Sequence, residues 1–138
     1  MMRNQSGYPD PTAEEAIGHV IAEEHREARR PMVYICAPYR GNIERNIRKA
    51  RKYSRFAVEQ RKTPIATHLL FPQILGKEET AENRKIAGLM AKQIIRRCRE
   101  LWWFGDVPTE EMMEEIRYAD RAGVIVRHFS GNCEEVVA

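Results

Sequence analysis

The sequence contains few of the features that mark secreted, metal-binding or membrane-spanning proteins. Its three cysteines (Cys36, Cys98 and Cys133) are odd in number and show no CxxC spacing, so neither a disulfide framework nor a zinc ribbon is predicted. The four histidines are scattered, whereas metal ligands usually lie close together in sequence. No apolar run approaches the roughly 20 residues that cross a bilayer, and the first residues lack the pattern of a secretory signal. We therefore expect a cytoplasmic protein with reduced thiols, no membrane contact and no metal or other cofactor.

The composition is that of an ordinary folded domain. Hydrophobic residues make up 43% and charged residues 31% of the 138 positions, a balance that argues against disorder. The net charge of +3 is too small to predict a nucleic-acid partner by itself. Residues 40–62 are more basic, with nine Arg or Lys against two Glu, a net charge of +7. A basic helix can track phosphates, but the same composition is common on solvated helices, so no nucleic-acid partner is expected.

Three segments can be distinguished along the chain. Residues 1–30 are predicted to form a tail and a helix over Ala13–Arg30, which starts after Asp10 and is stopped by Pro31. Residues 31–129 form the main domain, and residues 130–138 form a C-terminal tail without a structural signal. The first helix is charged and is assigned no chemistry.

Short apolar strands and amphipathic helices alternate through the main domain. The predicted strands are 32–36, 64–67, 101–104 and 124–127, and the predicted helices are 43–60, 81–97 and 109–122. The inward stripe of the first of these helices is read as Ile43, Ile47, Ala50, Ser54 and Ala57. Strict alternation predicts a three-layer α/β fold of the flavodoxin-like or Rossmann-like type with a parallel sheet, strand order 2-1-3-4 and an extra N-terminal helix.

The strand order also predicts where a ligand binds. In such sheets ligands bind beyond the carboxyl ends of the strands where the order reverses, here between the first and third strands. The loops that meet at this point are residues 37–42 and 105–109.

Glu115 is the candidate nucleophile. At about 100° per residue, Met112, Ile116, Ala119 and Gly123 share the apolar face of the last helix, while Glu110, Glu114, Arg117 and Arg121 share the watery face. Glu115 projects at the edge of the apolar face, where partial desolvation would raise the pKa of its carboxyl and improve its nucleophilicity. The alternative is a carboxylate that reaches solvent or pairs with an arginine.

The turn that precedes the helix over 43–60 is a candidate anion site. Arg40 and Gly41 come just before Asn42, a predicted N-cap, and free N–H groups at a helix start favour an anion such as phosphate or carboxylate. Thr109 caps the opposing helix and could offer its hydroxyl to the same anion. An ordinary turn and a plain N-cap would have the same sequence.

Three further polar residues are expected at the rim of this site. Asp106 is a candidate general acid, His68 a candidate ligand contact and Tyr39 a candidate orienting hydroxyl. Each is also compatible with a surface position.

Two of these motifs resemble the nucleoside 2-deoxyribosyltransferase superfamily. They are the strand and turn Tyr34–Gly41 and the helix stretch Glu115–Ala119, and the resemblance spans Met32 to Phe129. That family opens with a strand and a small-residue or Arg-Gly turn, and closes on a helix that carries its nucleophilic glutamate. Its 2′-deoxynucleoside 5′-phosphate hydrolases place an arginine after the first strand and a serine six residues before the glutamate. The chain is also similar to small uncharacterised proteins of bacteria and their phages.

The resemblance implies a small-molecule ligand, a nucleoside or a nucleotide. Arg40 and Thr109 stand at the positions of the family's arginine and serine, and Glu115 stands at the position of its nucleophile. The reaction would be N-deoxyribosyl transfer or hydrolysis of a deoxynucleoside or its monophosphate. The family also implies a homo-oligomer. The strand at Trp102 and Trp103 and the first helix would offer apolar surface for the subunit interface.

The chain departs from the family pattern at two places. Glu111 and Met113 replace glycines between the serine position and the glutamate. The family's second carboxylate would fall near Lys92 or Gln93, neither of which is an acid, although Asp106 could substitute for it. A nucleotide-binding sensor that lacks catalysis is therefore the competing hypothesis.

Overall fold

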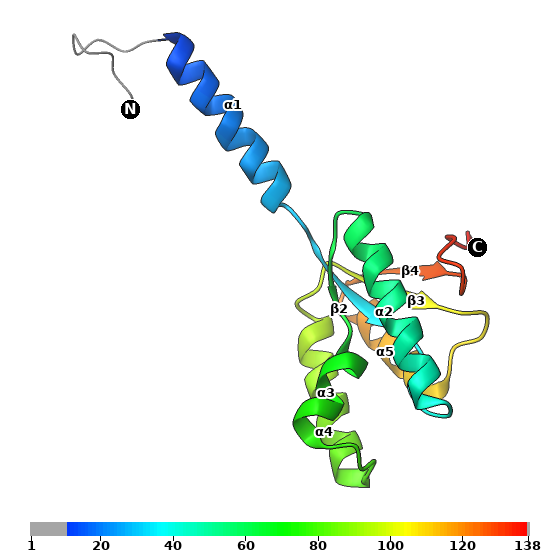
Figure 1. The fold of residues 1–138 in the computed structure, drawn as a ribbon. Helices are drawn as coiled ribbons and strands as arrows, with labels where there is room; N and C mark the ends of the chain where they lie inside the picture. The colour runs from blue at the N-terminus through cyan, green and yellow to red at the C-terminus, as the bar shows by residue number, and fades with distance from the viewer. Residues whose placement is uncertain (1–10, 138) are drawn as a thin grey trace. The chain divides into compact units, whose positions relative to one another are not determined.

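The computed structural model describes residues 11–137, with the side chains of residues 13–21 and 29–137 (Figure 1). The chain divides into two units at Arg30 and Pro31. The described part of the first unit is helix α1 (Pro11–Ala28), which ends two residues before the expected end. The predicted tail over residues 1–10 lies outside the described residues. Among the helices of residues 11–137, none is long and apolar enough to span a membrane.

The second unit is built on a four-stranded parallel sheet. Its strands are β1 (Met32–Cys36), β2 (Thr63–Ile65), β3 (Glu100–Phe104) and β4 (Ile125–Phe129). The order is β2-β1-β3-β4, so the predicted strand order is confirmed. β1 lies between β2 and β3, with Tyr34 opposite Ile65 on one side and Leu101 on the other. The sheet order reverses between β1 and β3, which places the expected ligand site at their carboxyl ends.

One face of the sheet is covered by α2 (Ile43–Glu59). Tyr53 and Ala57 of this helix pack with Val33, Ile35 and the aromatic side chains of β3 and β4. Trp102 belongs to this core and is 1% exposed, so it is not available for the subunit interface expected from the sequence. Tyr53 stacks on Phe104 with ring centroids 4.1 Å apart.

The predicted apolar stripe of α2 was partly wrong. The buried residues are Asn46, Ala50, Tyr53 and Ala57, whereas Ile43 is exposed. The helix is therefore rotated so that an asparagine, rather than an isoleucine, occupies the inward position of its first turns. Asn46 is tolerated there because its amide is hydrogen-bonded to the preceding loop.

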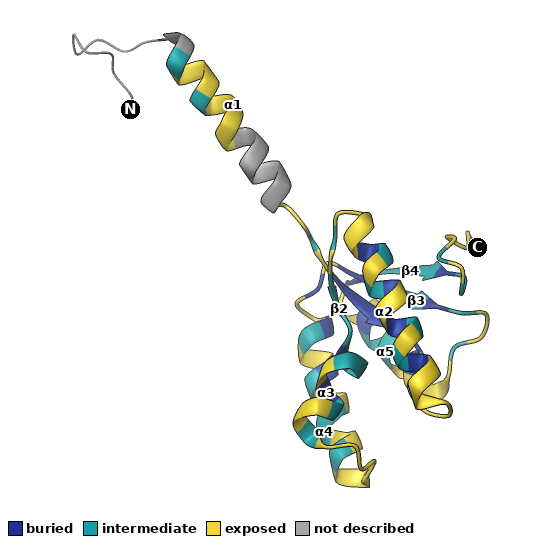
Figure 2. Ribbon diagram, in the orientation of Figure 1, coloured by how far each residue is buried: buried dark blue, intermediate teal, exposed yellow. Residues whose placement is uncertain are grey.

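The opposite face is covered by α3 (Thr67–Leu75), α4 (Ala81–Ile95) and α5 (Glu110–Arg121). Their buried side chains Phe71, Ala91, Ile95, Met112 and Ala119 pack against Tyr34, Cys36 and Leu101 of the sheet. In Figure 2 exposed segments are visible on the outer surfaces of α3 and α4. Gly123 follows α5 with a φ of 78°, a left-handed conformation that suits glycine after a helix end.

Helix α3 was missed at the sequence level. The second strand was expected to run to Thr67, but β2 ends at Ile65 and Thr67 is the first residue of α3. The helix has nine residues, contains Pro72 and has no side-chain cap, so none of the usual start signals announces it. Its position matters because it forms one side of the candidate site.

The C-terminal residues also contain structure that was not expected. β4 extends to Phe129, and Phe129 forms an isolated bridge with Glu135. Arg127 of β4 pairs with Glu135 through two hydrogen bonds of 2.8 Å, and with buried Glu100 at 3.3 Å. Glu135 thereby attaches the C-terminal segment to the edge strand.

Candidate functional site

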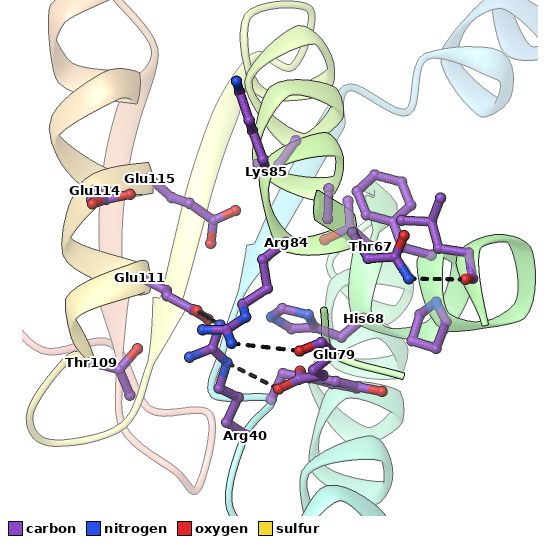
Figure 3. A pocket seen from close by; sticks show the side chains of 18 of the residues that line it. Arg40, Thr67, His68, Glu79, Arg84, Lys85, Thr109, Glu111, Glu114 and Glu115 are labelled. Carbon is purple, nitrogen blue, oxygen red and sulfur yellow. Dashed lines mark hydrogen bonds and ion pairs between the residues drawn. The ribbon is translucent and has the colours of Figure 1, made fainter. Parts of the chain in front are cut away.

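A pocket of about 610 Å³ lies at the carboxyl end of β1, between the loop after that strand and helices α3, α4 and α5. Its size is within the range of small-molecule sites. Of the expected site residues, five line it: Tyr39, Arg40, His68, Thr109 and Glu115. Figure 3 shows Glu115 projecting from α5 toward the space that His68 and Arg84 approach from the other side.

Glu115 is held by two donors from β1. The Tyr34 hydroxyl donates a hydrogen bond to Oε2 of Glu115, and the Cys36 thiol donates to Oε1 at 3.6 Å. Tyr34 and Cys36 are two residues apart, so they project from the same face of the strand. Each carboxylate oxygen therefore has its own partner, which fixes the orientation of the side chain.

Burial raises the pKa of the Glu115 carboxyl from its ordinary value of 4.5 to about 7. The hydrogen bonds from Tyr34 and Cys36 lower this pKa, while the nearby carboxylates of Glu111 and Glu114 raise it further. The upward shift is in the direction expected from the sequence. At neutral pH the carboxyl group exists in both protonation states.

A short chain of hydroxyls stands behind Glu115. The Tyr34 hydroxyl also lies 3.0 Å from Oγ1 of Thr67, the first residue of α3. Since a phenol has one proton and Tyr34 gives it to Glu115, the Thr67 hydroxyl donates to Tyr34. Burial raises the pKa of Tyr34 above its usual range, and burial also raises that of Cys36, so both remain protonated donors.

His68 is a neutral residue of the pocket wall. Burial lowers the pKa of its imidazole from 6.5 to about 4. Its Nε2 lies 3.0 Å from the carbonyl oxygen of Ala37, which can only accept, so Nε2 carries the proton. The ring stacks on Tyr39 with centroids 4.9 Å apart, and the two rings form an aromatic surface at the site.

Arg40 is paired with two carboxylates from different elements. Its Nε lies 3.2 Å from Oε2 of Glu79, in the loop before α4, and a terminal nitrogen lies 2.6 Å from Oε1 of Glu111 on α5. Arg40 was expected at the anion site, and the structure places it at the pocket with its charge already compensated. Glu111, which replaces a glycine of the family pattern, is one of the two partners.

The loop that carries Arg40 is fixed by α2. The Asn46 amide donates hydrogen bonds of 2.9 Å to the carbonyl oxygens of Tyr39 and Arg40. Asn42 caps the helix by accepting from the Arg45 backbone N–H at 3.1 Å, as predicted. Gly41 has a φ of 97°, in the left-handed region, which allows the sharp turn between Arg40 and Asn42.

Thr109 is the N-cap of α5, as predicted, and it also lines the pocket. Its Oγ1 accepts from the backbone N–H of Met112 at 3.2 Å. The proton of the hydroxyl remains available to a ligand, because the cap uses only its acceptor function.

Asp106 and Gly41 are not among the residues that line the pocket. Asp106 is exposed in the loop after β3, so nothing in its position supports the role of a general acid. Glu110 and Glu114 are exposed, as expected, but they also line the pocket and make the α5 side acidic. Lys92 of α4 lines the pocket as well, near the place expected for a second carboxylate.

Sequence reasoning did not identify Tyr34, Cys36, Thr67, Glu79 and Arg84 as parts of the site. The first two could have been found, since alternation along β1 places their polar atoms on one face. Thr67 and Glu79 could not, because α3 was not recognised and the loop after it could not be placed. Among the side chains that the structure describes, those of residues 13–21 and 29–137, no group of three or more His, Cys, Asp or Glu could hold a metal ion.

Comparison with known proteins gives a family and a fold. Residues 31–129 match the model of a family described as a domain of unknown function, DUF7768. No curated protein sequence matches the chain. Among solved structures, the chain is similar to the 2-deoxyribosyltransferase of the psychrotolerant bacterium Bacillus psychrosaccharolyticus, with a TM-score of 0.57 and 14% identity over 78% of this chain and 77% of that one. At this identity the likeness shows a shared fold.

Proposed function

The chain belongs to the DUF7768 family, and we propose that it binds a deoxynucleoside or deoxynucleoside monophosphate and cleaves its N-glycosidic bond with Glu115 as nucleophile. The observation that carries the proposal is the state of Glu115. It is a pocket-lining carboxyl, oriented by two donors, with a pKa raised to about 7 by burial. Fold similarity to a 2-deoxyribosyltransferase supports the class of ligand.

In the proposed reaction a Glu115 oxygen attacks the anomeric carbon of the sugar. The bond between that carbon and the base nitrogen breaks, and the base leaves with the electron pair and takes a proton from solvent. The resulting glycosyl ester is then attacked by water, which gives hydrolysis, or by a second base, which gives transfer. Tyr34 and Cys36 would orient the carboxylate throughout, because they contact it and remain protonated.

The other expected residues are assigned to binding. Arg40 and Thr109 would contact the anionic end of the ligand, and Gly41 would shape the turn that presents Arg40. The stacked pair of Tyr39 and His68 offers an aromatic surface suited to a base or sugar face. Asp106 has no role in the proposed reaction, because it is exposed outside the pocket and the base takes its proton from solvent.

The proposal is tested by a panel of deoxynucleosides and deoxynucleoside monophosphates. The protein is incubated with each compound at pH 8, and free base is measured by chromatography. Release of base from at least one compound supports the proposal. Absence of both binding and release across the panel contradicts it.

A second candidate is a nucleotide-binding sensor without catalysis. It is favoured by Lys92, a cation that lines the pocket where the family pattern places its second carboxylate. Binding of a nucleotide without base release in the same panel would support the sensor.

We also propose that the protein is a cytoplasmic homo-oligomer. Exposed apolar side chains support the homo-oligomer: Val20 and Ile21 on α1 and Leu70 and Ile74 on α3. A monomeric mass by light scattering at assay concentration would contradict it.

A further inference from the structure

Two arginines from different elements contact Glu79 at the pocket. Arg40, after β1, approaches the Glu79 carboxylate at 3.2 Å, and Arg84 of α4 donates to the Glu79 backbone oxygen at 3.5 Å. Arg40 also pairs with Glu111 at 2.6 Å. Figure 3 shows the two arginine side chains entering the pocket together with the Glu79 and Glu111 carboxylates.

We propose that Arg40 and Arg84 form a subsite for a phosphate monoester, and that the Glu79 carboxylate, which pairs with Arg40, occupies the Arg40 side of it as an internal competitor in the absence of ligand. A guanidinium binds carboxylate and phosphate through the same N–H groups, so a carboxylate can hold the place of a phosphate. The Glu111 carboxylate pairs with a terminal nitrogen of Arg40 in the same way. The proposal concerns the anionic part of the ligand. It rests on the proposed function only in taking the rest of the ligand to be a nucleoside.

The geometry allows Glu79 to leave without unfolding its loop. The side chains of Arg40 and Glu79 are 40% and 35% exposed, so water can replace either partner. An ion pair of such exposure changes an equilibrium by a factor of only about one to five. The loop itself is anchored elsewhere, since the Asn83 amide donates to the carbonyl oxygens of Leu75 and Glu78 at 3.2 and 3.1 Å. Rotation of the Glu79 side chain would therefore free the Nε side of Arg40, while the terminal nitrogen of Arg40 stays paired with Glu111.

The arrangement has a consequence for specificity. A dianionic phosphate can contact both guanidinium groups and displace a monoanionic carboxylate, whereas an uncharged nucleoside leaves the pair of Arg40 and Glu79 in place. Because Glu110, Glu111 and Glu114 make the α5 side acidic, the positive charge that binds the phosphate would come from Arg40 and from α4, which contributes Arg84, Lys85 and Lys92. The subsite thus separates monophosphates from nucleosides by charge.

The first test uses the full chain and inorganic phosphate at constant ionic strength, with dissociation constants measured by NMR titration. Glu79→Gln should bind phosphate about two to five times more tightly than the parent, because the competitor is removed. Glu78→Gln is the matched control, since Glu78 lies in the same loop and lines the pocket but forms no ion pair among the described residues. Equal tightening in both variants would show a general charge effect and would overturn the proposal.

The second test removes Arg84. Arg84→Ala should weaken phosphate binding about tenfold, as expected for the loss of a hydrogen bond between charged groups. Arg48→Ala is the control, because it removes an exposed cation of α2 outside the pocket. It should change the dissociation constant for phosphate less than twofold, since a distant exposed charge has only a weak effect. Equal phosphate affinity in Arg84→Ala and the parent would also overturn the proposal.

The failure of this subsite can be distinguished from the failure of the proposed function. If the variants change phosphate affinity as expected but no deoxynucleoside compound binds, the subsite stands and the proposed function fails. If deoxynucleosides lose base while phosphate affinity is unchanged by Glu79→Gln and Arg84→Ala, the function stands and the subsite fails.

Discussion

The hydroxyl of Tyr34 donates a hydrogen bond to Oε2 of Glu115, a residue 81 positions further along the chain. Tyr34 lies in the middle of the sheet and is 1% exposed, whereas Glu115 lines the pocket. The bond therefore connects the rigid core to the group proposed to react. Its energetic effect is to stabilise the charged form of a carboxyl that burial would otherwise keep protonated.

Tyr34→Phe should raise the pKa of Glu115 above its value of about 7, because the substitution removes a hydrogen bond that lowers that pKa. The rise of kcat/KM with pH, which reports the free enzyme, should move to higher pH. Tyr53→Phe is the control, since Tyr53 is buried on the opposite face of the sheet. Profiles with the same midpoint in Tyr34→Phe and the parent would mean that the hydroxyl does not act on Glu115.

Glu115 should also make the protein less stable at alkaline pH. The folded state holds the carboxyl at a pKa of about 7, above its ordinary 4.5, so between these values the folded state binds more protons than the unfolded state. The stabilisation of the folded state by this carboxyl is fully present below pH 4.5 and is lost as the pH rises through 7. The loss in the free energy of unfolding is at most about 3 kcal/mol, at 1.4 kcal/mol per pKa unit.

The measurement is the free energy of unfolding in urea at pH 5 and pH 8.5. Glu115→Gln should remove most of this pH-dependent loss, while Asp120→Asn, an exposed position on the same helix, should retain it. Parallel pH dependence in Glu115→Gln and the parent would show that the carboxyl titrates normally.

Arg40→Ala should weaken the binding of monophosphates more than the binding of nucleosides, because only the monophosphate presents an anion to the guanidinium. A loss of about tenfold for the monophosphate corresponds to one hydrogen bond between charged groups. Dissociation constants for matched pairs, such as a deoxynucleoside and its 5′-monophosphate, provide the comparison. Equal losses of affinity for the two ligands would mean that Arg40 is not part of the anion site.

Asn46→Ala should loosen the loop that carries Tyr39 and Arg40. The substitution leaves the carbonyl oxygens of these residues without their donor and should lower the free energy of unfolding by about 1–3 kcal/mol. Ser54→Ala on the same helix should cost less, because Ser54 bonds only within α2. If monophosphate binding is unchanged in Asn46→Ala, the loop is not part of the ligand site.

The sequence was sufficient for the strand order and for the position of Glu115, for different physical reasons. Strand alternation and connection handedness are local and restrict a parallel sheet to few topologies, so the order β2-β1-β3-β4 followed from the pattern. Glu115 followed from helical periodicity next to Met112 and Ala119. Both arguments depend only on neighbours in sequence.

The partners of these residues could not be predicted in the same way. The contacts of Glu115 with Tyr34 and of Arg40 with Glu79 join segments far apart in the chain. Asn46 was overlooked because a polar residue inside a helix face is stable only when tertiary acceptors satisfy its amide. Asp106 was expected near the pocket from its loop, but the loop directs it to solvent.

The central claim is that Glu115 is the nucleophile, and covalent trapping tests it most directly. A 2-fluoro-2-deoxynucleoside slows release of a glycosyl ester, so intact-protein and peptide mass spectrometry should find the added sugar on the peptide that contains Glu115. Glu115→Gln should bind the compound but gain no mass and release no base, while Asp120→Asn should be labelled like the parent. A label on any other residue, or full base release by Glu115→Gln, would contradict the account.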